Sequence, residues 1–571
     1  MTTEQYSGRV RALFIFFILI ALALVTKLYL VQIVEGDDFT NRADRQYALP
    51  SGSLFDRGSI YFTDKTGREI SAATLESGFT LTINPVALVH PEEVYTALSK
   101  YVTLDKTDFL LRAGKTDDPY EEVLKGLDKE TADSIKALEL PGVTLFKEQW
   151  RLYPAGSRAA HALGIVGFEG DERAGRYGLE RYYEHVLARG QSKAYTNFFA
   201  EVFSNVKQVV DTDDAEVEGN LVTTIEPTVQ GALDDKLAEV AKTWSVKSAG
   251  GIIMDPKTGE IYALSGYPTF DPNDFASEPD VSVFTNPLVE KVYEMGSIVK
   301  PLTMAAGLDA HVVTPDTTYN DLGSISVDTY KISNYDGKGR GVVPMQQVLS
   351  QSLNTGIAFV VGKLGNKRFA DYFRAYGLGE ETGIDLPSEQ HGLITNLESP
   401  RDVEYITAGF GQGIAVTPIA MTRALATLGN GGMLVTPHLV KEITYDLGLS
   451  KTIAHPSDER VLSAETSTTI TRMLVRVVDE ALLGGTVKMD HYSIAAKTGT
   501  AQIANKEGGG YYKDRYLHSF FGYFPAYDPK FIVFLYVEEP KNVNYASETL
   551  THPFMDLAEF LINYYEVPPD R

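Results

Sequence analysis

Cysteine is absent from this chain of 571 residues, and basic residues are fewer than acidic ones. The lack of cysteine excludes thiolate catalysis, disulfide bonds and cysteine-ligated zinc sites. The 52 Lys and Arg residues, set against 76 Asp and Glu residues, leave a net charge of −24. Because so acidic a surface repels a phosphate backbone, we expect no nucleic-acid partner.

Signatures of metal and nucleotide binding are missing as well. The ten histidines form no HExxH pair, so a zinc-peptidase site is not predicted. The GKT run at Gly114 resembles the end of a phosphate-binding loop, but Phe109 stands where that loop requires a glycine. The GFGQG run at Gly409 predicts a turn before a helix. We therefore expect neither a metal ion nor a cofactor.

A long apolar run does occur, close to the N-terminus. Residues 12–34 are almost entirely apolar, and about 20 such residues suffice for a helix to cross a bilayer. Arg9 and Arg11 precede this run, which favours a cytoplasmic N-terminus and export of the remainder. We expect a cytoplasmic tail over residues 1–11 and a single transmembrane anchor over residues 12–34. The rest of the protein would lie on the periplasmic side of the inner (plasma) membrane.

The apolar run has two other interpretations. A cleaved signal peptide is one, because Ala21-Leu22-Ala23 fits a cleavage site. Signal peptides usually become polar after such a site, whereas this segment continues to Val34. A buried core helix is the other, but a segment at the extreme N-terminus has no obvious partner to cover it. We favour the uncleaved anchor.

The sequence pattern changes near residue 221. Residues 35–221 mix short strand-like runs, such as FTLTINP from Phe79, with acidic helical runs, such as the one that starts at Pro119. This region carries no catalytic constellation, so we predict a non-catalytic domain. Residues 222–571 are predicted to form a second domain, which is large but feasible as one unit.

The larger domain has strand hairpins at both ends and helices between them. Apolar runs flank the turn-forming sequences PKTG, from Pro256, and PAYDPK, from Pro525, and this arrangement predicts two β-hairpins. We expect another strand over residues 493–503, a helix over residues 227–242 and long helical stretches from about residue 297 to 480. This order predicts an α+β fold in which helices cover an antiparallel sheet built from both ends of the domain.

Three short motifs follow one another in this domain. They are Ser-x-x-Lys at Ser297, Ser-x-Asn at Ser352 and Lys-Thr-Gly at Lys497. Each motif is weak evidence alone, but their order is that of serine acyl-transferring enzymes with a lysine beside the nucleophile. We therefore assign a catalytic function to the triple.

Further copies of two of these motifs are interpreted as structural. Ser-x-x-Lys recurs at Ser204, without a glycine or a helix start before it, and we expect a surface segment there. Lys-Thr-Gly recurs at Lys65 and Lys257 in DKTGRE and DPKTGEI, where the aspartate and glycine predict turns with solvated lysines. The copy at Lys497 lies among small and apolar residues, which suits a strand with an open edge.

The residues around Ser297 predict an activated nucleophile. Gly296 permits a sharp turn, and the residues after it are helical in pattern. The amide of Ser297 would be one of the unpaired N–H groups at a helix start, which can bind an oxyanion. Lys300 follows one turn later on the same face, so its amine can reach the hydroxyl. As a base it must be neutral, and we expect burial and the nearby Lys497 to lower its pKa.

The chain resembles the penicillin-binding proteins, specifically the class B, monofunctional transpeptidases. YEMGSIVKP resembles the nucleophile box of that family, SLN its second motif and KTGTA its third. MDPKTGEIYALSGYPTFDPN, AGFGQGIAVTPIAMTRALATLGNGG and HSFFGYFPAYDP resemble other blocks of its catalytic domain. DRGSIYFTDKTGREI and RLYPAGSRAAHALGIVGFEG resemble its non-catalytic pedestal. The likeness thus covers nearly the whole chain.

The resemblance implies a fold and a reaction. The fold would be an elongated mixed pedestal over residues 35–221, followed by a transpeptidase domain like that of serine β-lactamases, with helices on both faces of a five-stranded antiparallel sheet. The reaction would be the cross-linking of peptidoglycan stem peptides through an acyl-serine formed from D-Ala-D-Ala donors. β-Lactam antibiotics would acylate the same serine.

The resemblance also implies the roles of single residues. Ser297 would be the nucleophile and Lys300 its base, while Ser352 would relay a proton and Asn354 would bind the substrate backbone. Amides of Ser297 and Thr500 would form the oxyanion hole. The expected catalytic residues are Ser297, Lys300, Ser352, Asn354 and Lys497, and the expected substrate-binding residues are Thr498, Gly499 and Thr500.

Related interpretations remain open. Ser-x-Asn and the chain length favour the division-specific branch (penicillin-binding protein 3 type) over the elongation branch. The partners would then include a polytopic glycan polymerase and other division proteins. A β-lactam-hydrolysing enzyme or carboxypeptidase shares the triple but needs neither anchor nor pedestal. A β-lactam receptor would need an intracellular output domain. A non-catalytic division scaffold would not need the intact triple.

Overall fold

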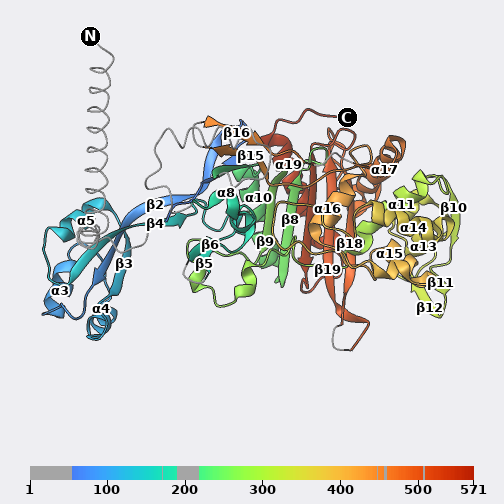
Figure 1. Ribbon diagram of the computed structural model, residues 1–571. Coiled ribbons are helices and arrows are strands. Elements are labelled where there is room, and N and C mark those ends of the chain that lie inside the picture. Colours follow the sequence, from blue (N-terminus) through green and yellow to red (C-terminus); the bar gives the residue numbers. More distant parts are fainter. Residues whose placement is uncertain (1–54, 170–171, 190–217, 446–447, 456–458, 506–507) are drawn as a thin grey trace, which may run out of the picture. The chain divides into compact units, whose positions relative to one another are not determined.

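The computed structural model describes residues 55–169, 172–189, 218–445, 448–455, 459–505 and 508–571 (Figure 1). These residues form two compact units, which are described separately. The described part of the first unit is Phe55 with Ser77–Trp150, and that of the second is Asp56–Glu76 with Arg151–Arg571.

Some sequence-based expectations fall outside this range. The predicted tail (1–11), the predicted anchor (12–34) and Ser204 are not among the described residues. Within the described ranges, no helix combines the length and the apolar character that a membrane crossing requires.

The described part of the first unit contains three helices and part of a sheet. The helices are α3 (Pro91–Leu98), α4 (Lys106–Ala113) and α5 (Lys129–Lys136), and the strands are the second half of β2 (Glu69–Ile83), β3 (Glu121–Leu127) and β4 (Val143–Leu152). The side chains of Asp105 and Asp128 accept hydrogen bonds from backbone N–H groups and so cap the starts of α4 and α5. The strand FTLTINP, predicted from Phe79, is confirmed as part of β2.

Strand β3 corrects the prediction of a helix from Pro119. Residues 121–127 pair with β2, and the helical segment starts only after the cap at Asp128. Leu127 is buried in the core of the unit, so tertiary packing overrides the helical pattern here. Gly126 has a φ of +77°, which a regular helix does not accommodate.

A five-stranded antiparallel sheet forms the centre of the second unit. Its strands, in spatial order, are β18 (Ala495–Ala504), β19 (Tyr511–Phe524), β20 (Phe531–Glu538), β8 (Ser248–Met254) and β9 (Ile261–Tyr267). Both predicted hairpins and the predicted strand near residue 495 are therefore confirmed. The sheet draws strands from the two ends of the region after residue 222, as expected (Figure 1).

Helices bury both faces of this sheet. Helices α10 (Pro227–Trp244) and α19 (Thr551–Tyr564) share one apolar core with Val533, Leu535 and Val537 of β20. The alternate residues Phe534 and Tyr536 belong to the core on the other face. That core includes α11 (Lys300–Asp309), α13 (Asn354–Leu364), α15 (Asp402–Gly409), α16 (Pro418–Ala426) and α17 (Ala464–Arg476). The alternation follows from the two-residue period of a strand.

The helical middle of the unit is less continuous than expected. Four strands, β10 (Thr318–Asp321), β11 (Ser324–Val327), β12 (Tyr330–Ser333) and β13 (Gly341–Pro344), form two small hairpin-like sheets before α12 (Met345–Ser350). Two short strands, β14 (Met433–Leu434) and β17 (Glu459–Arg460), pair between α16 and α17. The predicted helical stretches between residues 297 and 480 are present, but the strands between them were not predicted. Strand pairing between neighbouring segments outweighs the local pattern.

The compact units do not follow the predicted boundary at residue 221. Strand β1 (Ile60–Thr63) pairs in parallel with β7 (Gly219–Thr223), which pairs with β15 (Val440–Tyr445). Leu163 and Leu179 also share a core with Ile252 of β8. Asp56–Glu76 and the described residues from Arg151 up to position 221 therefore pack as one unit with the larger region, because their apolar side chains complete its core.

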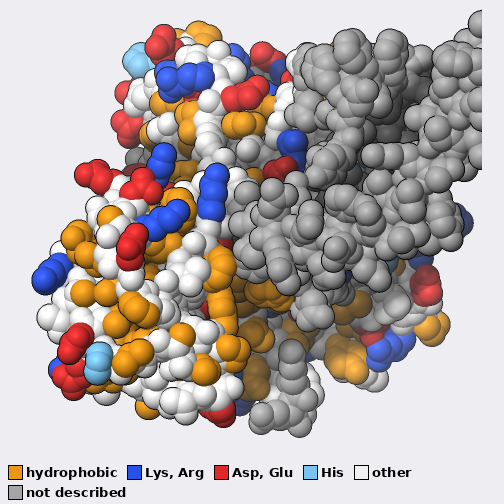
Figure 2. All heavy atoms as spheres, turned by 60° about the vertical axis from the view of Figure 1, so that its left-hand side comes forward, with side chains coloured by type: hydrophobic (Ala, Val, Ile, Leu, Met, Phe, Trp, Pro, Cys, Tyr) orange, Lys and Arg blue, Asp and Glu red, His pale blue; other side chains and the backbone are white. Residues whose placement is uncertain are grey.

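Charged side chains of both signs are visible on one face of the described residues. In the coloured part of Figure 2, basic and acidic side chains are interspersed, with hydrophobic side chains between them. No single acidic patch is visible in that coloured part.

Candidate active site

Ser297 lies in a single 3₁₀ turn, Gly296–Val299, that leads directly into α11. The α-helix therefore starts at Lys300, three residues after Ser297. The sequence pattern instead predicts that the helix starts at Ser297 itself. Residues three apart in a 3₁₀ turn eclipse one another, so Ser297 and Lys300 project to the same side. The Ser297 side chain is partly exposed, which leaves it accessible to a ligand.

Gly296 makes this turn by close backbone contacts. Its φ is +64°, and a Cβ atom there would lie 2.9 Å from the carbonyl oxygen of Thr500. Its N–H donates to the carbonyl of Gly411, 3.1 Å away. The turn thus fits between strand β18 and the glycine-rich segment after α15, and only glycine fits this space.

Lys300 is buried against the second motif. The residue is 1% exposed. Its Nζ donates to the carbonyl oxygen of Ser352 over 2.6 Å and to the Oγ of Ser352 over 3.1 Å. No described carboxylate forms an ion pair with it. Burial, followed by the positive charge of Lys497, holds the pKa of Lys300 well below its usual value. The predicted direction of this shift is confirmed.

The second motif lies between α12 and α13. Ser352 has a φ of +54°, an uncommon conformation for a serine, and its carbonyl oxygen contacts Lys300. Asn354 is the first residue of α13, and its Nδ2 donates to the carbonyl oxygen of Ser333, 2.8 Å away. This motif therefore contacts the first motif through Ser352 and the β11–β12 sheet through Asn354.

The third motif lies on β18, at one edge of the five-stranded sheet. Lys497 is 4% exposed, and its Nζ donates to the carbonyl oxygen of Thr498 over 3.1 Å. Burial lowers the pKa of Lys497 to about 8. A Cβ atom on Gly499 would lie 2.7 Å from the carbonyl oxygen of Met295, so this strand passes directly against the turn that carries Ser297.

Thr500 has a partner that fixes its hydroxyl. The Oγ1 of Thr500 accepts a hydrogen bond from the N–H of Ala546, at the start of α18 (Ala546–Thr549), over 3.1 Å. Since the oxygen accepts this bond, its own proton remains available to an acceptor elsewhere. Thr500 is partly exposed, so a ligand can reach that donor.

The three motifs are therefore brought together although they lie far apart in the sequence. Lys300 joins the first motif to the second, and the contacts of Gly296 and Gly499 join the first to the third. The arrangement gives Ser297 in the turn that leads to the buried Lys300, whose amine contacts Ser352 and has a lowered pKa, together with a second lysine on the edge strand β18. Such a group suits nucleophilic acyl transfer with an anionic, extended substrate.

The other copies of Lys-Thr-Gly lie at turns, as predicted. Lys65 is exposed between β1 and β2, and Lys257 is exposed between β8 and β9, where it pairs with Asp528. The GKT run at Gly114 follows the end of α4, and Lys115 pairs with Glu121. Within the described ranges, no group of three or more His, Asp or Glu residues could hold a metal ion.

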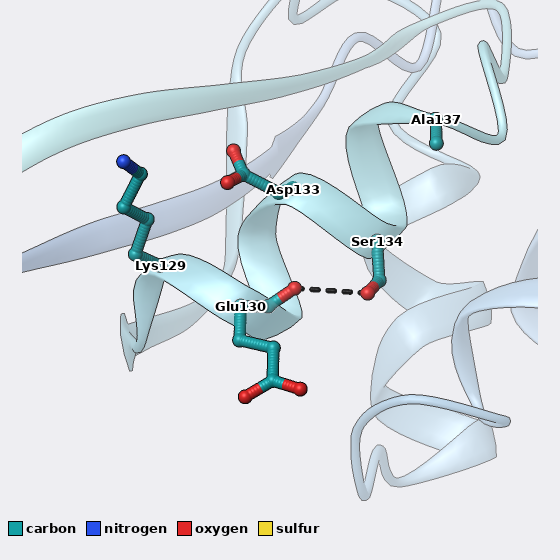
Figure 3. A pocket seen from close by; sticks show the side chains of 5 residues that line it. All are labelled: Lys129, Glu130, Asp133, Ser134 and Ala137. Atoms are coloured by element: carbon teal, nitrogen blue, oxygen red, sulfur yellow. Dashed lines mark hydrogen bonds between the residues drawn. The ribbon is translucent and has the colours of Figure 1, made fainter.

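A hollow of about 620 Å³ on α5 offers no comparable chemistry. Its described lining comes from one helix, namely Lys129, Glu130, Asp133, Ser134 and Ala137 (Figure 3). The Ser134 hydroxyl donates to the carbonyl oxygen of Glu130 over 2.9 Å. The nucleophile of this hollow would thus be engaged by its own helix and would lack a buried base.

Several contacts of the site were not foreseen from the sequence. Ser333 holds Asn354 through a carbonyl oxygen, and Ala546 holds Thr500 through an N–H group. A backbone carbonyl or N–H group is present in nearly every residue, so the residue type does not predict such a contact. The alternating glycines after Gly409 were interpreted only as a turn, and their contact with Gly296 is a second reason for them.

Comparison with known proteins identifies relatives along the whole chain. The family model "Penicillin binding protein transpeptidase domain" matches residues 249–557, and "Penicillin-binding Protein dimerisation domain" matches residues 55–224. The two domains of these models meet between residues 224 and 249, close to the boundary predicted from the sequence.

Individual relatives agree with the family models. "Stage V sporulation protein D" of Bacillus subtilis is 31% identical over 97% of this chain and 85% of its own length. "Peptidoglycan D,D-transpeptidase FtsI" of Escherichia coli is 25% identical over 94% of this chain and 88% of its own length. The crystal structure of apo penicillin-binding protein 3 from Mycobacterium tuberculosis aligns with a TM-score of 0.66 at 26% identity, over 74% of this chain and 92% of that one.

Proposed function

Because the chain belongs to the class B penicillin-binding proteins, we propose that it is a serine-type peptidoglycan D,D-transpeptidase with Ser297 as its nucleophile. One observation carries this proposal: the buried Lys300 amine contacts Ser352 and lies near Lys497, without a carboxylate partner among the described residues. A lysine in these surroundings is readily neutral, and a neutral amine three residues from a serine is a base for that serine.

The first half of the reaction forms an acyl-enzyme. Ser297 Oγ attacks the carbonyl carbon of the penultimate D-Ala of a stem peptide, and Lys300 takes the hydroxyl proton. The new C–O bond forms as the C–N bond to the terminal D-Ala breaks. Ser352, which lies within hydrogen-bond distance of Lys300, passes a proton to the departing amine. Free D-Ala leaves with that proton.

The oxyanion of the intermediate requires donors. We assign them to the backbone N–H groups of Ser297 and Thr500, which belong to the 3₁₀ turn and to the adjacent edge strand. Loss of one such donor typically slows a reaction by about 100- to 1000-fold.

The edge of β18 would bind the donor peptide as an additional antiparallel strand. An antiparallel peptide with its C-terminus beside Lys497 would extend toward Thr500 and beyond. The terminal carboxylate would then meet the ammonium of Lys497 and the hydroxyls of Thr498 and Thr500. Gly499 lets the strand lie close to the Ser297 turn, and Asn354 would bind the peptide backbone.

The second half of the reaction forms the cross-link. An amine from a neighbouring stem peptide attacks the ester carbon, a C–N bond forms and the C–O bond to Ser297 breaks. The proton of the amine returns to the serine oxygen through Lys300. β-Lactams would acylate Ser297 in the same way, since opening their ring leaves no departing group.

The wider biological role is proposed from the sequence pattern. Ser-x-Asn at Ser352 favours a role in septal wall synthesis, and the apolar run over residues 12–34 favours a single-pass anchor in the plasma membrane. A polytopic glycan polymerase and other division proteins would be the partners. A fluorescent fusion that concentrates at mid-cell would support the septal role, and labelling along the side wall would favour elongation instead.

An acyl-transfer assay tests the catalytic proposal. The protein is incubated with a donor peptide thioester ending in D-Ala-thioglycolate and with a D-amino acid as acceptor, and products are followed by mass spectrometry. A transfer product that disappears in Ser297→Ala supports a transpeptidase. Hydrolysed donor alone would instead indicate a carboxypeptidase or β-lactamase, and no turnover with no penicillin adduct would indicate a non-catalytic scaffold.

A further inference from the structure

A buried carboxylate–amide pair lies next to the second motif but belongs to none of the three. Asp321 ends β10 and Asn334 follows β12, and they are 2% and 3% exposed. The Nδ2 of Asn334 donates to both carboxylate oxygens of Asp321, over 3.1 and 3.0 Å. The pair thus joins the two small sheets that precede α12.

This pair holds the residue after Asn354 through its N–H and its hydroxyl. The N–H of Thr355 donates to the Oδ1 of Asn334 over 3.2 Å, and its hydroxyl, which has a single proton, lies 2.8 Å from Asp321 Oδ1 and 3.1 Å from Asn334 Oδ1. Its neighbour Asn354 donates to Ser333, the neighbour of Asn334. Two consecutive residues on the β12 side therefore clamp two consecutive residues at the start of α13.

The clamp has a consequence for the substrate side of Asn354. Its Nδ2 is directed to the Ser333 carbonyl, and among the described residues no donor bonds its Oδ1, which can therefore accept a bond from a ligand N–H. Ser352 lies two residues earlier, and its carbonyl and hydroxyl receive the Lys300 amine. A shift at Thr355 would thus move both the substrate-binding amide and the partner of the base.

We propose that the buried Asp321–Asn334 pair is a positioning element for the second motif, setting the orientation of Asn354 and the place of Ser352 during acylation of Ser297. This inference rests on the proposed function. Neither residue of the pair is assigned a contact with the substrate. Their effect would pass through Thr355 and the two residues before it.

The charged and titratable neighbours of the pair are few. The backbone N–H of Arg340 donates to Asp321, and its guanidinium pairs with Asp336. The Tyr319 hydroxyl lies 3.1 Å from Thr355 Oγ1. Helix α13 contributes only the Thr355 N–H and hydroxyl to the pair. Asp321 is therefore the carboxylate of the pair, and the Asn334 amide donates the hydrogen atoms that bond its oxygens. Without an N–H group at position 334, two oxygen atoms would face each other with no hydrogen between them.

The substitution Asn334→Asp tests this directly. It replaces the donating amide by a second carboxyl group, and two carboxylates at this distance cannot both stay ionised without strong repulsion. At about pH 8 we expect acylation of Ser297 by a fluorescent penicillin to slow about 10- to 100-fold. Toward about pH 5 one shared proton would restore the donor. The ratio of variant to parent rates should therefore rise as the pH falls.

Two further variants make the test specific. Asn430→Asp is the matched control, because Asn430 also donates through its amide in a turn but contacts Pro256 and Met433, away from the motifs. It should leave the pH dependence of acylation unchanged. The exchange Asp321→Asn with Asn334→Asp keeps one amide and one carboxylate, and should recover part of the rate lost in Asn334→Asp.

The outcomes separate the inference from the proposed function. Parent protein that is not acylated at Ser297 would refute the proposed function itself. Parent acylation together with a rate ratio that does not change with pH, and no recovery in the exchange variant, would overturn the positioning role alone. A melting temperature measured for every variant at each pH identifies loss of rate that merely follows unfolding.

Discussion

The two edge strands of the five-stranded sheet, β9 and β18, differ in how many of their outward-facing backbone groups have hydrogen-bond partners. On the β9 edge, Gln230 accepts from the N–H of Leu264 and donates to its carbonyl oxygen, over 2.9 and 3.2 Å. The Thr224 hydroxyl donates to the Ile261 carbonyl, and the Ile261 N–H donates to His438. Side chains and neighbouring backbone thus occupy the polar groups of this edge.

The β18 edge is left open. Within the described ranges, its backbone bonds to other backbone groups only through β19, and the side-chain donors to its carbonyl oxygens are Lys497, which bonds Thr498, and Ser519 of β19, which bonds Gly499. An open strand edge is a liability that proteins usually cover, because it invites pairing with another chain. Here the open edge carries Lys497 and Thr500 and lies against the Ser297 turn. Under the proposed function, the fold covers one edge for stability and leaves the other for the donor peptide.

Removing the proposed base should have the largest effect. Lys300→Ala deletes the amine that contacts Ser352 and that we propose as the base for Ser297, and we expect acylation by penicillin to slow about 100- to 10,000-fold. Stopped-flow or gel-based labelling with a fluorescent penicillin measures this rate. A variant that acylates at the parent rate would show that another group removes the proton.

Displacing the open edge should have the next largest effect. Gly499→Ala places a Cβ atom against the Met295 carbonyl and should push β18 away from the Ser297 turn, so we expect acylation to slow about 100-fold. Gly251→Ala is the control in β8, where the new atom meets the side chains of Leu233 and Leu535. Equal losses of acylation rate in the two variants would refute a special role for the β18 edge.

The pH profile should sharpen the role of the two lysines. Acylation needs neutral Lys300 and charged Lys497, so the rate should rise with pH through the lowered pKa of Lys300. The rate should then fall as Lys497, with a pKa of about 8, loses its proton, because neutral Lys497 would no longer form an ion pair with the carboxylate of the penicillin. In Lys497→Arg the guanidinium stays charged, so the fall should move to higher pH. An alkaline limb at the same pH in both proteins would contradict this assignment.

Removing the side-chain hydrogen bonds at the β9 edge should have the smallest effect on the acylation rate. Gln230→Ala leaves the N–H and carbonyl of Leu264 unpaired in the interior, and should lower the free energy of unfolding by about 1–3 kcal/mol. Urea unfolding measures this loss. The acylation rate of the folded variant should stay within about twofold of the parent. A large loss of rate at unchanged stability would mean that the two edges are coupled.

The parts of the fold and of the site that could be predicted are those marked by a short, continuous stretch of sequence. Both hairpins of the large sheet carry turn sequences between apolar runs, and the three motifs are short enough to recognise. The closed edge was not foreseen, because Gln230 looks like any polar residue of a helix until Leu264 is placed beside it. The strands between residues 318 and 344 were missed for another reason: they pair with neighbouring segments, but each is only four residues long and so shows little periodicity.

The most direct test of the open edge as an acylation site is to locate the adduct. The protein is treated with benzylpenicillin, digested with protease and mapped by tandem mass spectrometry, with Ser297→Ala as the comparison. The account predicts one penicilloyl group per chain, on Ser297, and none in the variant. An adduct on any other residue, or equal labelling of the variant, would contradict it.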